Sequence, residues 1–460
     1  MAHNGQHGSE VEKAHSLPRV LGFWDIIGII VGGVIGSGIF IVPAEVAVQV
    51  TAPLLILAVW AVGGVLSYFG ALSSSELGAA YPHAGGIYVY LREAYGPLFA
   101  FLFGWTLFLV IDAGAVATLA VAFSTSYLTH FIQLTSLEAK LIAVALIALL
   151  VVINYIGVRT GAFVQNFLTI IKFAALVGIC GIVFIFAKSG HVTNFFKPAP
   201  GHFSMGLLGK FGVAMIATLW AYKGWEAATY SAGEVKKPEK NLPLGLLLGT
   251  MICVVIYILT NLAYLYVVPA ETMATSPKIA SDVMNIVVGP IGASVIAGII
   301  LFSIIGAANA TIMTSPRVYF AMAKDGLFFK KVAEVHPKFL TPHISIVAIG
   351  LWSVVLSLTG TFEQLFTYVI FGEWVFFGLM VAAVIILRKK RPDLPRPYKT
   401  WGYPVTPIIF VLAALFISVN SLVTGFWNAF RGLAIILLGV PVYLYWSRKK
   451  KKEQEGAATS

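Results

Sequence analysis

Long apolar runs are the feature that most restricts how this chain can fold. Hydrophobic residues make up 58% of its 460 residues and charged residues only 11%, whereas soluble proteins carry about 25% charged residues. A membrane-spanning helix needs about 20 predominantly apolar residues. Twelve runs approach or exceed that length: 22–48, 53–78, 98–127, 140–158, 160–187, 207–232, 242–268, 291–322, 343–360, 364–388, 405–425 and 427–447. The sequence therefore predicts an all-α membrane protein with twelve transmembrane helices.

The first apolar run contains glycines where a spanning helix should be continuous. Its centre reads IIGIIVGGVIGSGIF. Each glycine costs about 1 kcal/mol relative to alanine inside a helix, and backbone groups freed within hydrocarbon need new partners. We predict that this helix breaks and that N–H groups at Gly36, Ser37 and Gly38 bind a carboxylate. The alternative is close helix packing through a Gly32-x-x-x-Gly36 contact.

A second interruption lies in the run 207–232, whose centre reads WAYKGWE (220–226). A charge at the bilayer centre costs about 2.5–3.5 kcal/mol, so it must be paired or functional. Lys223 and Glu226 could pair with each other if the segment stayed helical. Otherwise one or both face a substrate cavity beside Gly224. Two interrupted spans, five spans apart, predict a five-plus-five inverted repeat.

Lys172 lies on a polar stripe of the fifth run. Gln165, Thr169 and Lys172 are spaced so that they share one helix face, which should be directed to the bundle interior. Three roles are open for this lysine. It could carry a proton, act as a fixed cation in place of a bound sodium ion, or tie down backbone carbonyls of a broken helix.

The eighth run supplies further candidates for structural or coupling roles. Ser303 belongs to a face of small residues, which is more often helix packing than a site, and Asn309 is a candidate ligand. Other acids fall within apolar runs and could serve as proton sites or gates: Glu45, Asp112 and Glu373.

The net charge of +11 reports membrane topology. With the N-terminus inside, 23 of the 31 Lys and Arg residues fall in cytoplasmic segments, six fall outside, and Lys172 and Lys223 lie within spans. This asymmetry follows the positive-inside rule, so both termini are expected in the cytoplasm of a multi-pass plasma (inner) membrane protein. Membrane lipids rather than nucleic acid are the expected counterpart of the basic segments.

Features of other protein classes are missing from the sequence. The two cysteines lie in apolar runs and offer no metal spacing, and His3, His7 and His15 have no ligand pattern. We therefore expect neither a metal nor a cofactor. No protease or esterase motif occurs in any run, so the chain is not expected to be an enzyme. Interrupted spanning helices are typical of transporters. The other alternative to a transporter is a sensor that binds an amino acid without moving it. No segment has room for the signalling domain that a sensor would need.

The organisation follows the runs. We expect a cytoplasmic tail, two five-span repeats, a peripheral pair of spans and a basic cytoplasmic tail, at 1–21, 22–188, 189–388, 389–447 and 448–460.

Several motifs resemble the amino acid–polyamine–organocation superfamily, and within it the L-type amino acid transporters and their bacterial relatives. They are IIVGGVIGSGIF, WAYKGWEAATYSAGEVKKPEKNLP, ILTNLAYLYVVPAETM, RVYFAMAKDGLFF and RPDLPRPYKTWGYPVTP. Their order extends the resemblance over nearly the whole chain. It implies a LeuT-like fold of five-plus-five inverted repeats with two peripheral helices. It also implies sodium-independent transport of L-amino acids, usually as obligatory exchange.

The resemblance also implies roles for individual residues. The glycine-serine-glycine motif should take the substrate α-carboxylate, and carbonyls around Trp220 and Ala221 should take the α-amino group. Trp220 matches an aromatic gate, and Lys172 matches a lysine that ties the two broken helices together. The substrate-binding residues expected on these grounds are Ile35, Gly36, Ser37, Gly38, Trp220, Ala221, Tyr222, Lys223, Gly224 and Glu226.

The chain departs from the family pattern in two places. Gly or Asp is usual at the position of Lys223, and Asn at that of Glu226, so the side-chain pocket is altered. The outside segment 128–139 lacks a cysteine, so no disulfide-linked glycoprotein subunit is expected. We predict exchange of small or medium neutral amino acids. The alternatives are a proton-coupled symporter and a transporter of cationic amino acids.

Overall fold

The computed structural model describes residues 17–188, 190–196, 205–276, 278–359 and 362–458. His3, His7 and His15 lie outside these residues, as does most of the predicted tail 1–21. Strands are absent from the described chain, apart from an isolated bridge between Leu21 and Val235. The predicted all-α class is therefore confirmed.

The helices follow the predicted apolar runs closely. The first half contains α2 (Phe23–Val34), α3 (Gly38–Gln49), α4 (Pro53–Ala80), α5 (Ile87–Tyr95), α6 (Pro97–Thr106), η1 (Leu107–Ile111), α7 (Asp112–Ala122), η2 (Phe123–Tyr127), η3 (Leu128–His130), α8 (Ser136–Ile156) and α9 (Val158–Phe186). The second half contains η4 (Val192–Phe196), α10 (Met205–Ala221), α11 (Ala227–Tyr230), η5 (Ala232–Glu234), α12 (Pro238–Val267), α13 (Ala270–Thr275), α14 (Ile279–Val288), α15 (Pro290–Thr314), α16 (Pro316–Lys324), η6 (Lys330–Ala333), α17 (His343–Thr359), α18 (Phe362–Lys390), α19 (Val405–Thr424) and α20 (Phe426–Ala458). Among the described residues, eight helices are long and apolar enough to cross a membrane, or nine if α2 and α3 form one bent span. The number twelve stays a prediction.

Both expected helix interruptions are present. The first separates α2 from α3, which meet at an angle of 41°. The second separates α10 from α11, and residues 222–226 form turns between them. Glycines and charged residues at these points make a continuous helix unfavourable. The breaks were thus predictable from local sequence.

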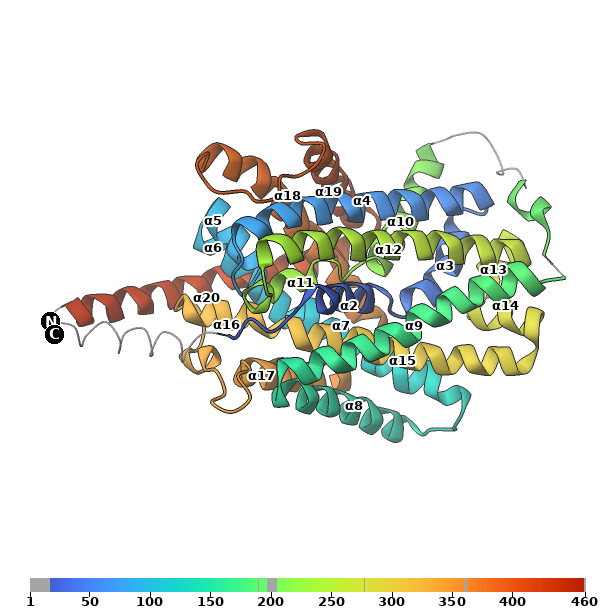
Figure 1. Ribbon diagram of the computed structural model, residues 1–460, viewed down its shortest axis with the longest axis horizontal. Coiled ribbons are helices and arrows are strands. Elements are labelled where there is room, and N and C mark those ends of the chain that lie inside the picture. Colours follow the sequence, from blue (N-terminus) through green and yellow to red (C-terminus); the bar gives the residue numbers. More distant parts are fainter. Residues whose placement is uncertain (1–16, 189, 197–204, 277, 360–361, 459–460) are drawn as a thin grey trace.

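The broken first span lies inside the bundle. α2 packs against α9, α12 and α15, and α3 packs against α10, as the central position of α2 in Figure 1 shows. α19 and α20 pack on α18 and on each other. This arrangement places the α2–α3 and α10–α11 breaks in the interior, where side chains of neighbouring helices can satisfy their backbone groups.

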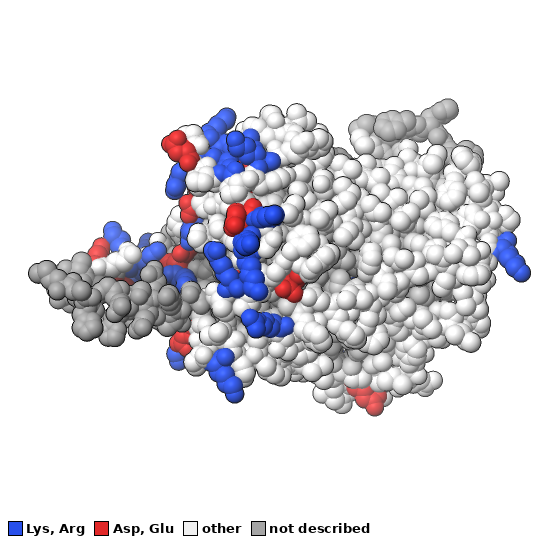
Figure 2. All heavy atoms as spheres, viewed as in Figure 1, with Lys and Arg blue, Asp and Glu red and all other residues white. Residues whose placement is uncertain are grey.

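Charged residues gather at one end of the molecule. On the face shown in Figure 2, Lys and Arg side chains crowd near the left end, towards which α20 extends in Figure 1, and most of the remaining surface is uncharged. A buried ion pair links α16 to η5: Arg317 Nε lies 2.6 Å from Glu234 Oε1. The Glu234 carbonyl also accepts a hydrogen bond from the Leu21 N–H group at 2.9 Å. These contacts join three chain segments that are distant in sequence.

Candidate binding site between the two helix breaks

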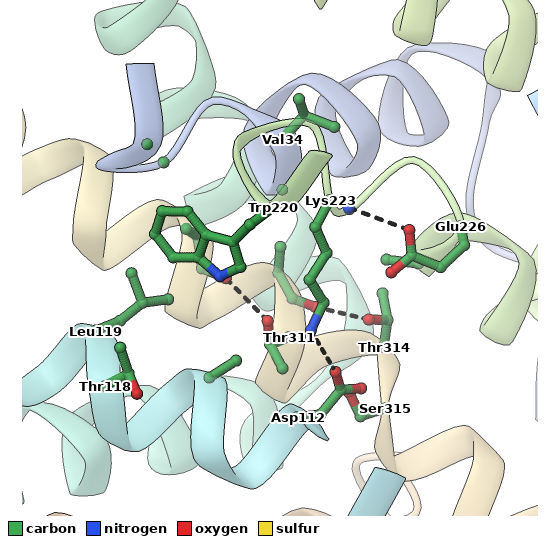
Figure 3. Close-up of a pocket in the computed structure, with 18 of the residues that line it drawn as sticks. Val34, Asp112, Thr118, Leu119, Trp220, Lys223, Glu226, Thr311, Thr314 and Ser315 are labelled. Atoms are coloured by element: carbon green, nitrogen blue, oxygen red, sulfur yellow. Dashed lines mark hydrogen bonds and ion pairs between the residues drawn. The ribbon is translucent and has the colours of Figure 1, made fainter. Parts of the chain in front are cut away.

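A pocket lies between the two breaks (Figure 3). Its volume is about 70 Å³, and one water molecule needs about 10–15 Å³ on this measure. The space therefore suits a group of about five to seven water-sized units. The lining comes from both breaks and from α7 and α15: Gly33, Val34, Gly36, Ser37, Gly38, Asp112, Ala115, Thr118, Leu119, Trp220, Ala221, Lys223, Gly224, Glu226, Ala227, Tyr230, Ala307, Ala310, Thr311, Thr314 and Ser315.

The first break presents a helix N-terminus to the pocket. α3 begins at Gly38 after the non-helical residues 35–37. The first N–H groups of a helix have no acceptor within that helix, and the helix dipole adds positive potential there. The N–H group of Gly36 differs from the prediction, because it donates to the Val34 carbonyl at 2.8 Å. Ser37 and the start of α3 are therefore the better anion donors.

The second break approaches the first closely at two glycines. A methyl group on Gly38 would lie 2.8 Å from the Ala221 side chain, and one on Gly224 would lie 2.7 Å from the Gly33 backbone. Gly224 also has a φ of +120°, a conformation that side chains disfavour. The glycines therefore serve both in helix packing and in forming the binding site. The glycines let the two breaks meet, and the pocket forms where they meet.

Tyr257 of α12 links the two breaks directly. Its hydroxyl lies 2.7 Å from the Val34 carbonyl oxygen and 3.2 Å from that of Ala221. The side chain is buried and stacks at a tilt on Tyr222, with ring centroids 5.0 Å apart. Sequence reasoning missed this residue, because a tyrosine within an apolar run gives no local signal of a long-range contact.

The C-terminal end of α10 places carbonyl groups opposite the start of α3. The Trp220 carbonyl accepts a hydrogen bond from the Lys223 N–H group at 3.0 Å. Each carbonyl oxygen has two lone pairs, and the C-terminal end of a helix carries negative potential. Figure 3 shows the Trp220 indole lying towards Leu119 and Thr311, at the side of the pocket. The arrangement can hold an anion at one break and a cation at the other.

Lys172 binds the first break from α9. Its side chain is fully buried, and Nζ lies 2.5 Å from the Gly32 carbonyl oxygen, 2.7 Å from that of Ile35 and 3.3 Å from that of Ser303. The Ser303 hydroxyl donates to the Ile35 or Gly36 carbonyl, each at 3.1 Å. The recorded bonds of Lys172 thus join the α2–α3 break to α15. These hydrogen bonds of Lys172 do not extend to the second break, which Tyr257 joins to the first.

Lys223 does not pair with Glu226 as a helix would have allowed. Its Nζ lies 3.3 Å from Asp112 Oδ1 and forms a closer ion pair with Glu373 Oε1. Glu226 instead accepts the Gly224 N–H group at 3.1 Å. Because residues 222–226 form turns, the spacing of a helix face does not apply to them. The alternative of an internal Lys223–Glu226 ion pair is therefore wrong.

Five of the thirteen predicted site residues are absent from the pocket lining: Ile35, Lys172, Tyr222, Ser303 and Asn309. Tyr222 is directed towards α4, where its hydroxyl donates to the Trp60 carbonyl at 3.2 Å. Ile35 contributes its carbonyl to Lys172. The Asn309 amide donates to Gln165 Oε1 at 2.8 Å, so this side chain links α15 to α9. The other eight predicted binding residues line the pocket.

Hydroxyl groups on α7, on α15 and at the residue that follows α15 complete the pocket and were not predicted. They belong to Thr118, Thr311, Thr314 and Ser315. The Ser315 hydroxyl forms a short hydrogen bond with Asp112 Oδ2. Asp112 follows the π-helical turn η1, a feature that often occurs at functional sites. Threonine and serine within apolar runs are common, so their sequence positions alone did not single them out.

Comparison with known proteins identifies the family. A family model described as amino acid permease matches residues 21–439. The b(0,+)-type amino acid transporter 1 of Mus musculus is 32% identical over 443 residues, which are 95% of this chain and 89% of that protein.

Two other relatives match over similar lengths. The serine/threonine exchanger SteT of Bacillus subtilis is 32% identical over 441 residues, 95% of this chain and 98% of the relative. The human cystine/glutamate transporter is 31% identical over 431 residues, which are 92% of this chain and 85% of that protein. The resemblance found in the motifs is confirmed. This chain belongs to the amino acid permease family of the amino acid–polyamine–organocation superfamily, whose members are membrane transporters and not enzymes.

Proposed function

We propose that this protein exchanges small neutral L-amino acids across the cell membrane by alternating access, without sodium. One observation carries the proposal: the N-terminal end of α3 and the C-terminal end of α10 are directed at the same pocket. An α-amino acid carries a carboxylate and an ammonium a few ångströms apart. Opposed helix ends match these two charges in sign.

The carboxylate is assigned to the first break. Ser37 and the first turn of α3 offer N–H groups without intrahelical acceptors, and Gly38 lets the backbone approach the substrate. The ammonium is assigned to the carbonyl groups around Trp220 and Ala221. Trp220, at the side of the pocket in Figure 3, closes over the bound substrate as an aromatic lid.

The size of the pocket supports a small substrate. Alanine and serine have six and seven heavy atoms, and the 70 Å³ cavity accommodates a comparable number of water-sized units. The threonine and serine hydroxyls of α7 and α15 offer partners for a short polar side chain. SteT, the bacterial relative, is a serine/threonine exchanger, and its name agrees with this substrate class.

Independence from sodium is supported by Lys172. Its ammonium lies among three backbone carbonyl oxygens at 2.5 to 3.3 Å. Carbonyl oxygens of an unwound span are the ligands that coordinate sodium in related transporter architectures. The Lys172 ammonium therefore stabilises the break without a sodium ion from solution.

The charge distribution supports a plasma (inner) membrane topology with both ends of the chain in the cytoplasm. The basic end of the molecule in Figure 2 would face the cytoplasm under the positive-inside rule. Anionic lipid would then contact the Lys and Arg residues around it. The absence of a cysteine from segment 128–139 is the basis for expecting transport without a disulfide-linked subunit.

Counterflow in proteoliposomes tests the proposal. We expect labelled L-alanine to enter sodium-free vesicles preloaded with unlabelled L-alanine, and not to enter empty vesicles. Uptake into empty vesicles driven by a pH gradient would instead identify a proton-coupled symporter. Competition by a panel of amino acids then defines the side chain that the pocket accepts. Absence of uptake under every condition would refute amino acid transport.

A further inference from the structure

Four charged side chains from three parts of the chain meet beside the pocket. Asp112 begins α7, Glu373 lies on α18, and Lys223 and Glu226 belong to the second break. The carboxylates of Asp112, Glu226 and Glu373 are named here the acidic cluster. Lys223 Nζ contacts two of them, and Figure 3 shows its side chain extending from the break towards Asp112 and Ser315.

Carboxyl groups outnumber ammonium groups in the acidic cluster. Within the described chain, one lysine ammonium faces three carboxylates, and the lysine and glutamate side chains are nearly buried: 14% of the Lys223 side chain and 5% of that of Glu373 are exposed. Lone carboxylates at membrane depth are costly, so a cation beside them is strongly favoured. At present that cation is the end of the Lys223 side chain.

A second observation indicates that the pocket takes a polar ligand. The Thr118 hydroxyl is buried and has no hydrogen-bond partner in the described part of the chain. Thr118 lines the pocket on the same helix as Asp112 and Ala115, at spacings of about one turn. Buried hydroxyl groups are normally paired, so this group is available to a substrate.

The ammonium of Lys223 is the same chemical group that ends the side chain of a lysine or ornithine substrate. We propose that Lys223 acts as a tethered cation that fills an acidic side-chain subsite, and thereby restricts the transporter to neutral amino acids. A cationic substrate would have to displace Lys223 or lie beside its like charge. Shortening this residue would open the subsite and leave the acidic cluster to bind a substrate ammonium. This inference rests on the proposed exchange function.

The test compares L-lysine and L-alanine exchange by wild-type protein and Lys223→Ala in proteoliposomes. We expect the wild type to exchange alanine at a much higher rate than lysine. In the variant, lysine exchange should exceed the wild-type rate by at least about tenfold, because a charge-assisted hydrogen bond replaces like-charge repulsion. Ornithine should compete with lysine, and norleucine, which lacks the side-chain charge, should compete poorly. Lys223→Arg keeps the cation and should not gain lysine exchange.

A second variant covers the case in which Lys223→Ala does not fold. Lys223→Ala/Glu373→Gln removes the closest ion pair as a unit and leaves Asp112 and Glu226, so lysine exchange should again rise. Adding Asp112→Asn should remove that gain in lysine exchange.

The outcomes distinguish a failure of the role proposed for Lys223 from a failure of the proposed exchange function. Lysine exchange by the wild type at the alanine rate overturns the inference, as does a folded Lys223→Ala or double variant that exchanges alanine but gains no lysine exchange. Absence of alanine exchange by the wild type refutes the proposed function itself.

Discussion

Replacing Lys172 with methionine tests how the first break is held. Methionine keeps an unbranched side chain that is one heavy atom shorter, and it has no ammonium group. The Gly32 and Ile35 carbonyl oxygens then lose donors at 2.5 and 2.7 Å, although the Ser303 hydroxyl remains 3.1 Å from Ile35. The Gly32 carbonyl is therefore the group most affected by the loss of the lysine donor. A buried acceptor left without a partner costs about 1–3 kcal/mol.

This cost should appear mainly in substrate binding. The N–H groups assigned to the carboxylate, at Ser37 and Gly38, lie within about six residues after Gly32, so relaxation of the break moves them. A change of about 1–3 kcal/mol corresponds to about 5-fold to 150-fold weaker affinity. We would measure the half-saturation concentration of L-alanine for counterflow, and the melting temperature in detergent.

A control variant separates this effect from the loss of any lysine. Lys140→Met removes an exposed lysine at the start of α8 and should leave affinity and melting temperature unchanged. The reasoning would be refuted if Lys172→Met bound and exchanged alanine as the wild type does. A lower melting temperature with unchanged affinity would show that Lys172 supports the fold but not the site.

Three further predictions concern the breaks and the charged end of the molecule. Gly38→Ala should reduce exchange at least about tenfold, since its methyl group would lie 2.8 Å from Ala221 and would force the two breaks apart; exchange at the wild-type rate would contradict this. Glu234→Gln should lower the free energy of unfolding by about 3–5 kcal/mol, because it leaves the buried Arg317 guanidinium without a counter-charge; chemical denaturation checks this. Burial, and after it nearby guanidinium groups, lowers the pKa of His83 in the loop after α4. The neutral form therefore stabilises the fold above the ordinary imidazole range, and this contribution is lost as the pH falls; His83→Gln should flatten the acid side of a melting-temperature profile.

Local sequence was enough to predict the helix breaks. Glycines at Gly36 and Gly38, and the charges on both sides of Gly224, oppose a continuous helix whatever surrounds them. The apolar runs likewise predicted the helices, since burial in lipid requires only length and composition. These features depend on neighbours in the chain.

The partners of the charged residues could not be predicted in this way. Lys223 reaches Asp112 and Glu373, which are far away in sequence, and its helical spacing to Glu226 was misleading because the segment forms turns. Tyr257 joins the two breaks from a third helix without any motif. Such contacts depend on how helices pack, which one sequence does not specify residue by residue.

A structure with bound L-alanine tests the central claim most directly. The account predicts the α-carboxylate within hydrogen-bond distance of the N–H groups of Ser37 and Gly38, and the α-ammonium at the carbonyl groups around Trp220 and Ala221. The alanine methyl group should be directed towards α7 and α15. A substrate bound elsewhere, or one whose carboxylate faces the end of α10, would contradict the account.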